Sequence, residues 1–469
     1  MDTKKLRQKI LDLAIRGKLV PQDPTDEPAS GLLQRIRAEK ERLIAEGKIK
    51  RPKKSKTPSS ESNYTNLPSG WEKTTLKDIA WFGGGKTPST ENKQFWKDGT
   101  VNWVTSKDMK EPIINHSQIK LSDIGAVQNT LYPKGSLLMV TRSGILRRTL
   151  PLAILGEAAT VNQDIKTICT PYTELNEYLY YYFSGREKEI LEKFQKDGTT
   201  VESIDFEKFQ EIEILLPPLQ EQIRIIHQLK YLFNVQSNID SETSELKRLI
   251  NDSKSKILEL AMQGKLVPQD PTDEPAAEML KRINPNAKIL TDSQHSWNIP
   301  SNWIWISVKD IFKPMERELP SGDEFKYIDI DSIDNKTNTA HPKTILTKAA
   351  PSRASRKTRK GDIVFSMVRP YLKNIAIVPE DDCIASTGFY VLSCTRSINH
   401  VFAFLIAISD FFVKGLNSFM KGDNSPSINK DHIENYVIPL PPLNEQKRIV
   451  AKIEELYSVL DKIEASLQS

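Results

Sequence analysis

The sequence predicts an α+β protein in which two α/β domains, related by a pseudo-twofold repeat, are separated by an antiparallel, coiled-coil-like pair of long helices. Three observations predict this. The phrase GKLVPQDPTDEPA occurs at 17–29 and again, unchanged, at 264–276. The phrases LPPLQEQIRII and LPPLNEQKRIV, at 216–226 and 440–450, also repeat. In each half, the stretch between the first phrase and the second includes about 150 residues rich in strand-like apolar runs, which is enough chain for a hydrophobic core.

The composition is that of a globular protein of two or three domains. The chain has 469 residues, of which 38% are hydrophobic and 27% charged. A net charge of +5 is too small to indicate a partner by itself. Cys169, Cys383 and Cys394 form neither a disulfide framework nor a zinc-ligand spacing. No apolar run approaches the roughly 18 residues that span a bilayer, so we expect a cytoplasmic protein without membrane contact.

A helical segment and a proline-broken connector together occupy residues 1–30. Leu6, Ile10 and Leu13 recur at helical steps. The connector is predicted to be stiff and extended because it contains three prolines. Its second copy leaves two interpretations open: packing on the helix ends, or a docking surface for two copies of one partner. A recent duplication would also leave two identical copies.

Residues 31–66 are predicted to be a basic linker rich in serine and proline. The stretch KIKRPKKSKTPSSES at 48–62 is basic in its first half and polar in its second. Such a composition favours a solvated linker, with phosphate contact as the alternative.

Two globular domains are predicted at 67–217 and 296–441. Runs such as SLLMVTR and DIVFSMVR are typical of strands, and glycine and proline turns separate them. Amphipathic stretches at 176–194 and 400–416 indicate helices. Matching phrases, such as LPSGW and IPSNW near the two domain starts, follow in the same order.

A long helix is predicted at 218–264, a second connector at 265–295, and a C-terminal helix at 442–469. A bend is possible at 251–253, and Gly264 followed by Pro268 is a helix stop. The apolar residues of the long helix recur at steps of three and four, which indicates a heptad-like seam. Its members are Leu219, Ile223, Ile226, Phe233, Ile239, Leu246, Ile250, Ile257 and Leu260.

The repeat is cut open inside a helix. Its offsets make the last residue equivalent to position 245 and the first equivalent to position 248. The two termini therefore supply the two parts of a missing copy of the long helix. We expect them to lie close together, as chain ends often do.

No catalytic motif is visible. The segment FGGGKT at 82–87 has Ala80 where a phosphate loop needs glycine, and Pro88 follows at once. Neither an Asn-Pro-Pro-aromatic tetrapeptide nor a GxGxxG after a strand occurs. We expect the chain to bind no metal or cofactor and to be no enzyme by itself.

Polar and basic side chains gather instead on predicted loops, at corresponding places in both halves. Arginine suits guanine edges and asparagine or glutamine suits adenine, whereas Lys, Ser and Thr suit phosphates. Taken singly, a basic loop is more often only solvated. The candidates in the first domain are Lys86, Thr87, Ser106, Lys107, Arg142, Ser143, Asn162, Gln163, Thr199 and Thr200. Those in the second are Arg353, Arg356, Lys357, Arg369, Tyr371, Lys373, Asn374, Ser386, Thr387, Asn424 and Ser425.

Eight candidates are favoured as base-reading side chains. They follow a strand-like run in each half and include the residue types that read base edges. The first domain contributes Arg142, Ser143, Asn162 and Gln163, and the second Arg369, Tyr371, Lys373 and Asn374. For Tyr371, a place in the hydrophobic core is the alternative.

This layout resembles the specificity (S) subunit of type I restriction-modification enzymes over essentially the whole chain. The resemblance depends on LPPLQEQ and LPPLNEQ before helices, and on ILDLAIRGKLVPQDP and ILELAMQGKLVPQDP. It also depends on GGGKTPS and WVTSKDM in the first domain, and on PSRASRKTRKGDIVFSMVRP in the second.

The resemblance implies that each domain is a target recognition domain reading one half of a split site in double-stranded DNA. The helices would set the gap and dock two modification (methyltransferase) subunits, and two restriction (translocase/nuclease) subunits would complete the complex. S-adenosylmethionine, ATP and Mg would be bound by those partners, which would flip the target adenine and carry out the catalysis. The alternatives are a self-contained DNA-modifying enzyme and a coiled-coil scaffold without DNA binding.

Overall fold

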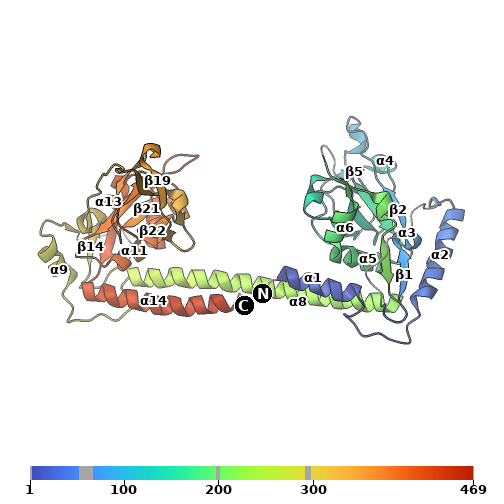
Figure 1. Ribbon diagram of the computed structural model, residues 1–469, viewed down its shortest axis with the longest axis horizontal. Coiled ribbons are helices and arrows are strands. Elements are labelled where there is room, and N and C mark those ends of the chain that lie inside the picture. Colours follow the sequence, from blue (N-terminus) through green and yellow to red (C-terminus); the bar gives the residue numbers. More distant parts are fainter. Residues whose placement is uncertain (1–2, 52–66, 197–200, 291–296, 468–469) are drawn as a thin grey trace. The chain divides into compact units, whose positions relative to one another are not determined.

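The computed structural model describes residues 3–51, 67–196, 201–290 and 297–467 (Figure 1). The chain divides into two compact units, an N-terminal unit up to Ser241 and a C-terminal unit from Glu242. The boundary falls inside α8 (Leu219–Met262), a helix of 44 residues that contributes to both. This helix is unbroken at 251–253, where the sequence suggested a bend. Gly264, with φ of +68°, follows its end as expected.

The N-terminal unit contains a five-stranded sheet in the order β2-β9-β6-β7-β4, a three-stranded sheet β5-β3-β8, and two two-stranded pairs, β1-β12 and β10-β11. The strands are β1 (Glu72–Thr75), β2 (Trp81–Gly84), β3 (Val101–Val104), β4 (Ile113–Ile114), β5 (Lys120–Leu121), β6 (Leu137–Val140), β7 (Leu152–Leu155), β8 (Ala159–Val161), β9 (Ile165–Cys169), β10 (Gln195–Lys196), β11 (Ser203–Ile204) and β12 (Glu213–Leu216). The helices before α8 are α1 (Thr3–Ile15), α2 (Ala29–Ala45), α3 (Leu76–Ile79), α4 (Asp123–Ala126), α5 (Thr173–Gly185), α6 (Glu187–Phe194) and α7 (Phe206–Phe209), with short 3-10 turns η1 (Lys93–Phe95) and η2 (Gly144–Arg147).

The C-terminal unit contains a six-stranded sheet β15-β24-β21-β22-β18-β17, a four-stranded sheet β19-β16-β23-β20 and a three-stranded sheet β13-β14-β25. The strands are β13 (Ile289–Leu290), β14 (Ile304–Ser307), β15 (Phe312–Lys313), β16 (Glu324–Ile328), β17 (Ile333–Asp334), β18 (Thr339–Ala340), β19 (Lys343–Leu346), β20 (Ala354–Lys357), β21 (Ile363–Ser366), β22 (Ile375–Ile377), β23 (Cys383–Ser386), β24 (Phe389–Cys394) and β25 (Val437–Leu440). The helices are α9 (Ala276–Ile283), α10 (Val308–Ile311), α11 (His400–Ile408), α12 (Asp410–Asn417), α13 (Lys430–Glu434) and α14 (Leu443–Ser466), with 3-10 turns η3 (Ile330–Ser332), η4 (Thr347–Ala349) and η5 (Pro370–Leu372).

The two domains share one topology, as the repeat predicts. The antiparallel set β2-β9-β6-β7 matches β15-β24-β21-β22, and the parallel pair β3·β8 matches β16·β23. The pair β1·β12, which joins the start and the end of the first domain, matches β14·β25. The fold class predicted from the sequence is therefore confirmed, and the two domains are copies of one architecture.

The cores form where the sequence has uninterrupted apolar runs. Strand β6 is buried at all four positions, and Ile363, Val364 and Phe365 of β21 are fully buried. Such continuous runs are expected of strands covered on both faces. In α5 the buried side chains recur at helical steps, so one face of the helix covers the sheet.

Each unit contains its own antiparallel helix pair. In the N-terminal unit α1 runs along α8, where the Arg7 guanidinium lies 3.7 Å from the centre of the Phe233 ring and Gln236 Nε2 donates to Thr3 O at 2.9 Å (Figure 1). In the C-terminal unit α14 runs along α8, where Lys254 lies 2.7 Å from Asp461. The closeness of the two termini stays a prediction, because the described chain ends belong to different units.

The heptad-like seam of α8 is only partly correct. Ile226 and Ile250 are buried, but Ile239 and Leu246 are 41% and 42% exposed. Leu229, which falls beside the predicted seam, is fully buried. The reason is that the apolar positions near the two ends of α8 face a domain or a second helix, whereas the middle positions do not.

Two predicted linkers contain helices. Residues 31–66 begin within α2, and the second connector contains α9. Leu32 and Ile36 of α2 and Met279 of α9 are buried. The helical spacing of apolar residues in these short segments therefore favours helices over an extended linker. Most of the basic, serine-rich stretch at 48–62 lies outside the described residues.

No single helix in the described part of the chain is long and apolar enough to cross a membrane. Helices α11 and α12 meet the criterion only together, as a pair bent by 50°. Phe402, Ile406 and Phe412 of this pair are buried in the second domain, so packing within the domain accounts for their apolar character.

Candidate nucleic-acid interface

Three loops of the first domain meet at one edge. Val104 of β3 lies beside Val161 of the parallel strand β8, and Val140 of β6 lies opposite Ile165 of β9. The segments that follow β3, β6 and β8 are therefore neighbours. Together they line an open, polar depression of about 450 Å³, formed by Ser106, Arg142, Ser143, Gly144, Gln163, Asp164 and Val201. Four of the site residues predicted from the sequence therefore lie around one depression, namely Ser106, Arg142, Ser143 and Gln163.

Backbone contacts hold Arg142 and Ser143 in this depression. Arg142 forms a bridge to Ser203, and Ser143 N donates to Glu202 O at 3.1 Å. The Ser143 hydroxyl caps η2 by accepting from Ile145 N. The Arg142 side chain is exposed, so its guanidinium can reach a ligand at the domain surface.

Gln163 and Asn162 have opposite surroundings. Gln163 is exposed, and its Oε1 accepts a hydrogen bond from the Thr87 hydroxyl. Asn162 is only 6% exposed, and its carboxamide forms hydrogen bonds with the backbone N–H and the carboxylate of Asp164, both at 3.2 Å. Asn162 therefore shapes the turn that presents Gln163, a place that differs from the predicted base-reading role.

The glycine-rich segment after β2 is built for close packing. A Cβ on Gly85 would lie 1.5 Å from Val161 O, so only glycine fits against β8. This contact places Lys86 and Thr87 beside Gln163, and Lys86 N donates to Asn129 Oδ1 at 2.7 Å. The side chains of Lys86 and Lys107 are exposed. Thr199 and Thr200 lie outside the described residues.

Arg369 occupies the corresponding corner of the second domain. It follows β21 with φ of +47°, and its guanidinium donates to Asn424 O at 2.8 Å. Lys373, with φ of +51°, pairs with Asp410 at 2.7 Å. Two non-glycine residues in this conformation within five positions are unusual, and such backbone is often found at functional sites. Tyr371 between them is 46% exposed and so does not lie in the core.

The two corners are equivalent in their backbone contacts. Thr141 N donates to Asp164 O at 2.8 Å, and Met367 N donates to Gly388 O at 2.9 Å. On the other side of the strand, Ile204 N donates to Thr141 O as Ile428 N donates to Met367 O, both at 2.9 Å. An exposed arginine thus follows this strand in both domains, beside the same two loops, but one position later in the second domain, where Val368 takes the bridge position of Arg142.

The basic run at 353–360 is less available than its sequence indicates. Lys357 pairs with Glu318 at 2.9 Å and Arg359 with Glu316 at 2.7 Å. Both glutamates lie far from the run in sequence. The hydrogen bond from Arg359 lowers the pKa of Glu316. Arg353 remains exposed.

The remaining candidates of the second domain differ in exposure. Asn424 and Ser425 are exposed, and Thr387, whose N–H donates to Arg353 O at 2.8 Å, is half-buried. Asn374 and Ser386 are buried, at 8% and 6% exposure. Arg356 is half-buried, and its Nε has no hydrogen-bond partner within the described ranges.

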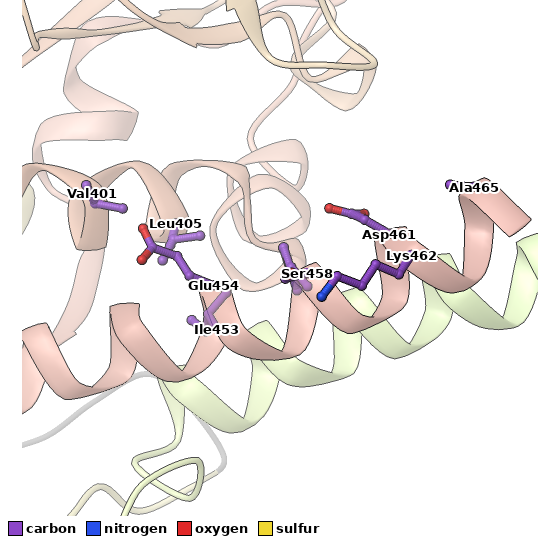
Figure 2. A pocket seen from close by; sticks show the side chains of 9 residues that line it. Val401, Leu405, Ile453, Glu454, Ser458, Asp461, Lys462 and Ala465 are labelled. Atoms are coloured by element: carbon purple, nitrogen blue, oxygen red, sulfur yellow. The ribbon is translucent and has the colours of Figure 1, made fainter.

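An open groove of about 520 Å³ lies between α11 and α14 of the C-terminal unit (Figure 2). Val401 and Leu405 line one side, and Ile453, Ser458 and Lys462 belong to the other. The groove was not foreseen, because its two walls are far apart in sequence.

Sequence reasoning also missed a buried carboxylate at the start of each helix that leaves a domain. Glu221 and Glu445 are 1% and 0% exposed. Each accepts a hydrogen bond from a tryptophan indole, Trp71 or Trp303, at 2.9 Å. The signal was present, because all four residues stand in repeated phrases, but spacing alone does not show that these phrases meet.

Comparison with known proteins agrees with this architecture. The model of the type I restriction modification DNA specificity domain matches residues 68–248 and 300–469. The EcoAI specificity subunit of Escherichia coli is 26% identical over 98% of this chain and 90% of its own length. The EcoEI specificity subunit of Escherichia coli is 24% identical over 99% and 91%. A chain from a solved structure of a type I R-M system, 18% identical, superposes with a TM-score of 0.57 over 86% of this chain and 96% of its own.

The family model covers well over half of the chain and matches it twice, once in each unit. The duplicated domain and the long helix between the two copies are the features that such a repeat requires. This chain therefore belongs to the type I restriction-modification DNA specificity family and is the specificity subunit of a type I restriction-modification system.

Proposed function

We propose that the two domains read the two halves of a bipartite site in double-stranded DNA. The observation that carries this proposal is the equivalence of the two loop corners, each of which presents an exposed arginine, because two copies of one surface suit two similar stretches of duplex. In the first domain Arg142 and Gln163 contact base edges, while Lys86, Thr87 and Lys107 contact phosphates. In the second domain Arg369 and Tyr371 read bases, and Arg353 contacts phosphate.

The helices set the distance between the half-sites. Helix α8 has 44 residues and, at about 1.5 Å per residue, a length of about 66 Å. It enters both units, so its length limits which spacers the two domains can bridge. DNA rises about 3.4 Å per base pair along its axis.

Two modification subunits and two restriction subunits complete the active complex. They bind S-adenosylmethionine, ATP and Mg and carry out the methylation and the cleavage, whereas this chain supplies the choice of sequence. Exposed apolar side chains on the helices support docking of such partners, since exposed apolar surface marks interaction sites. They are Tyr231, Ile239, Leu246, Leu249, Val459 and Ile463.

The test is methylome sequencing of a host that expresses the chain with its modification subunit. We expect methylated adenines only within one motif of two short half-sites separated by a fixed spacer. Methylation without a bipartite motif would contradict the proposal. DNA modification or cleavage by the purified chain alone would favour a self-contained enzyme, and DNA affinity that does not fall with salt would favour a scaffold without DNA contact.

A further inference from the structure

The repeated connector forms the same joint in both units. We define the joint of the N-terminal unit as residues 17–28, 68–71 and 221–224. Its counterpart in the C-terminal unit comprises residues 264–275, 300–303 and 445–448. Each joint brings together four parts: a helix end, the connector, the first turn of the domain and the start of the helix that leaves the domain.

A buried carboxylate lies at the centre of each joint. Gln22 Nε2 donates to Glu221 Oε1 at 2.6 Å, and Trp71 Nε1 donates to Glu221 Oε2 at 2.9 Å. Gln22 Nε2 also donates to Gly17 O at 3.2 Å. The glutamate thus connects the outgoing helix with the connector through one oxygen and with the domain through the other.

The second joint repeats these contacts with its own residues. Gln269 Nε2 donates to Glu445 Oε1 at 2.5 Å, and Trp303 Nε1 donates to Glu445 Oε2 at 2.9 Å. Gln269 Nε2 approaches Gly264 O at 3.4 Å. The hydrogen-bond distances are similar in the two joints. This similarity indicates that the identical connector sequences specify the geometry of the joint.

An ion pair fixes the connector a second time. Arg224 contacts both carboxylate oxygens of Asp26, at 2.5 and 3.1 Å. Arg448 contacts both oxygens of Asp273, at 2.6 and 3.3 Å. A two-point arginine–carboxylate contact restricts direction as well as distance.

The helix end itself packs tightly on the domain. Gly17 has φ of +64°, and a Cβ there would lie 2.5 Å from Pro68 Cγ. A Cβ on Gly264 would lie 2.4 Å from Pro300 Cγ. The first turn of each domain is also hydrogen-bonded to the end of its connector. Ala29 N donates to Gly70 O at 2.8 Å, and in the second joint Ala276 N donates to Asn302 O at 3.0 Å. The joint therefore leaves little freedom for the domain to turn on its helix.

A joint that served only stability would not need a buried carboxylate. Burying a charge is costly, and apolar side chains of similar size often stabilise a protein as well or better. Burial holds the pKa of Glu221 above its ordinary value, although the hydrogen bonds from Trp71 and Gln22 oppose this shift. A carboxylate that accepts one hydrogen bond from the connector and one from the domain fixes the orientation of these two parts relative to each other, which apolar packing does not do.

We propose that Glu221 and Glu445 are positioning residues, each of which fixes the setting of its domain on the outgoing helix and so the spacing at which the two half-sites are read. This inference rests on the proposed function of bipartite DNA recognition. It assigns to the connector a role in spacer discrimination, separate from the contacts that read bases.

The experiment replaces one carboxylate and measures spacer choice. In Glu221→Gln the amide can accept from only one of the two donors, so one arm of the joint is lost. The full chain with its modification subunit is offered DNA in which the half-sites are constant and the spacer is one base pair shorter, native or longer. We expect the preference for the native spacer to fall on the order of tenfold, as for the loss of one hydrogen bond to a charged group, while half-site base preference is kept.

Matched variants separate positioning from folding. Glu445→Gln should relax spacer choice in the same way, whereas Glu157→Gln, an exposed glutamate of the first domain, should leave it unchanged. Trp71→Phe keeps the aromatic packing and removes only the donor, so it tests the joint should Glu221→Gln fold poorly.

The outcomes are distinct. Relaxed spacer choice with retained half-site preference supports the inference. If Glu221→Gln, Glu445→Gln and Trp71→Phe all keep the native spacer choice, the inference is wrong. An equal loss of methylation at every spacer would also contradict it. Neither result would contradict bipartite recognition. A wild-type complex that ignores one half-site overturns the proposed function, and the inference with it.

Discussion

At the scale of single residues, the surroundings of a side chain decide whether it can meet DNA. Arg142 and Gln163 are exposed beside one depression, whereas Asn162, their neighbour in the same motif, is turned inward to Asp164. In the second domain Arg369 is exposed, but Lys373 pairs with Asp410. A polar loop thus contains both exposed members and members held by contacts within the domain.

Arg369→Ala is expected to relax base preference in one half-site only. Arg369 stands at one corner, and a good bidentate arginine–base contact contributes about 1–3 kcal/mol of discrimination. Arg142→Ala should have the same effect on the other half-site. Binding measured against single-base variants of each half-site checks this, and a uniform loss across unrelated sequences would instead identify a phosphate contact.

The pair formed by Arg147 and Glu202 predicts a pH dependence. The hydrogen bond from Arg147 lowers the pKa of Glu202 below its ordinary 4.5. A lowered pKa in the folded state contributes stability that is present above pH 4.5 and is lost as pH falls through the folded pKa. Arg147→Met should therefore reduce stability at pH 7, with the difference from wild type shrinking on acidification. Urea unfolding across this range checks it, with the exposed neighbour Arg148→Met as control.

At the scale of elements, short segments are fixed by contacts with distant chain. Helix α2 follows the connector and packs on α3 through Lys40, whose ammonium donates to Lys77 O, Asp78 O and Ala80 O at 2.6–3.1 Å. Burial lowers the pKa of Lys40 to about 8, so at pH 7 the side chain keeps the proton that its three hydrogen bonds require.

Lys40→Met should weaken the docking of α2. Each buried carbonyl left without a donor costs about 1–3 kcal/mol. Hydrogen exchange is expected to accelerate in α2 and in α3. Arg37→Met, an exposed change on the same helix, should not have this effect, and equal exchange in the two variants would contradict the role given to Lys40.

The end of α1 allows backbone cost and close packing to be separated. Gly17→Ala combines a positive φ with a contact to Pro68, whereas Gly47→Ala has φ of +68° and nothing within 4 Å of the new Cβ. The positive φ costs about 1–2 kcal/mol per residue, so Gly17→Ala should lower the free energy of unfolding by more than Gly47→Ala. An equal decrease in the free energy of unfolding for both variants would show that the joint rearranges to accommodate the added Cβ.

At the scale of the whole molecule, the duplication is the organising feature. Two units repeat one topology, one loop corner and one joint, and a single helix enters both. Recognition of a split site follows from this if the length of the shared helix sets the gap between half-sites.

Insertion of seven residues between Ser241 and Glu242 should lengthen the preferred spacer. The insertion point lies between the part of α8 that contacts α1 and the part that contacts α14. Seven residues add about 10 Å of helix, which corresponds to about three base pairs. Methylome sequencing checks the spacer, and an unchanged spacer with active methylation would show that α8 does not set it.

Much of this organisation is readable from the sequence, because its signals are local. Apolar spacing, glycine stops and repeated phrases identify α8, the strand-rich domains and the duplication, and the quoted motifs identify the family. The base-reading candidates were only partly separable, since exposed Gln163 and buried Asn162 are adjacent and similar in chemistry. Solvent exposure depends on which segments cover a loop, and no local pattern encodes it.

The sequence by itself determined that one unit occurs twice and that a connector recurs unchanged. Only the tertiary structure decided that the connector closes on a buried glutamate, that Glu316 and Glu318 pair with the basic run, and that three distant loops form one depression. The physical reason is that periodicity specifies elements within a few residues, whereas hydrogen bonds between segments 150 or more positions apart, such as that from Trp71 to Glu221, exist only once the chain has folded.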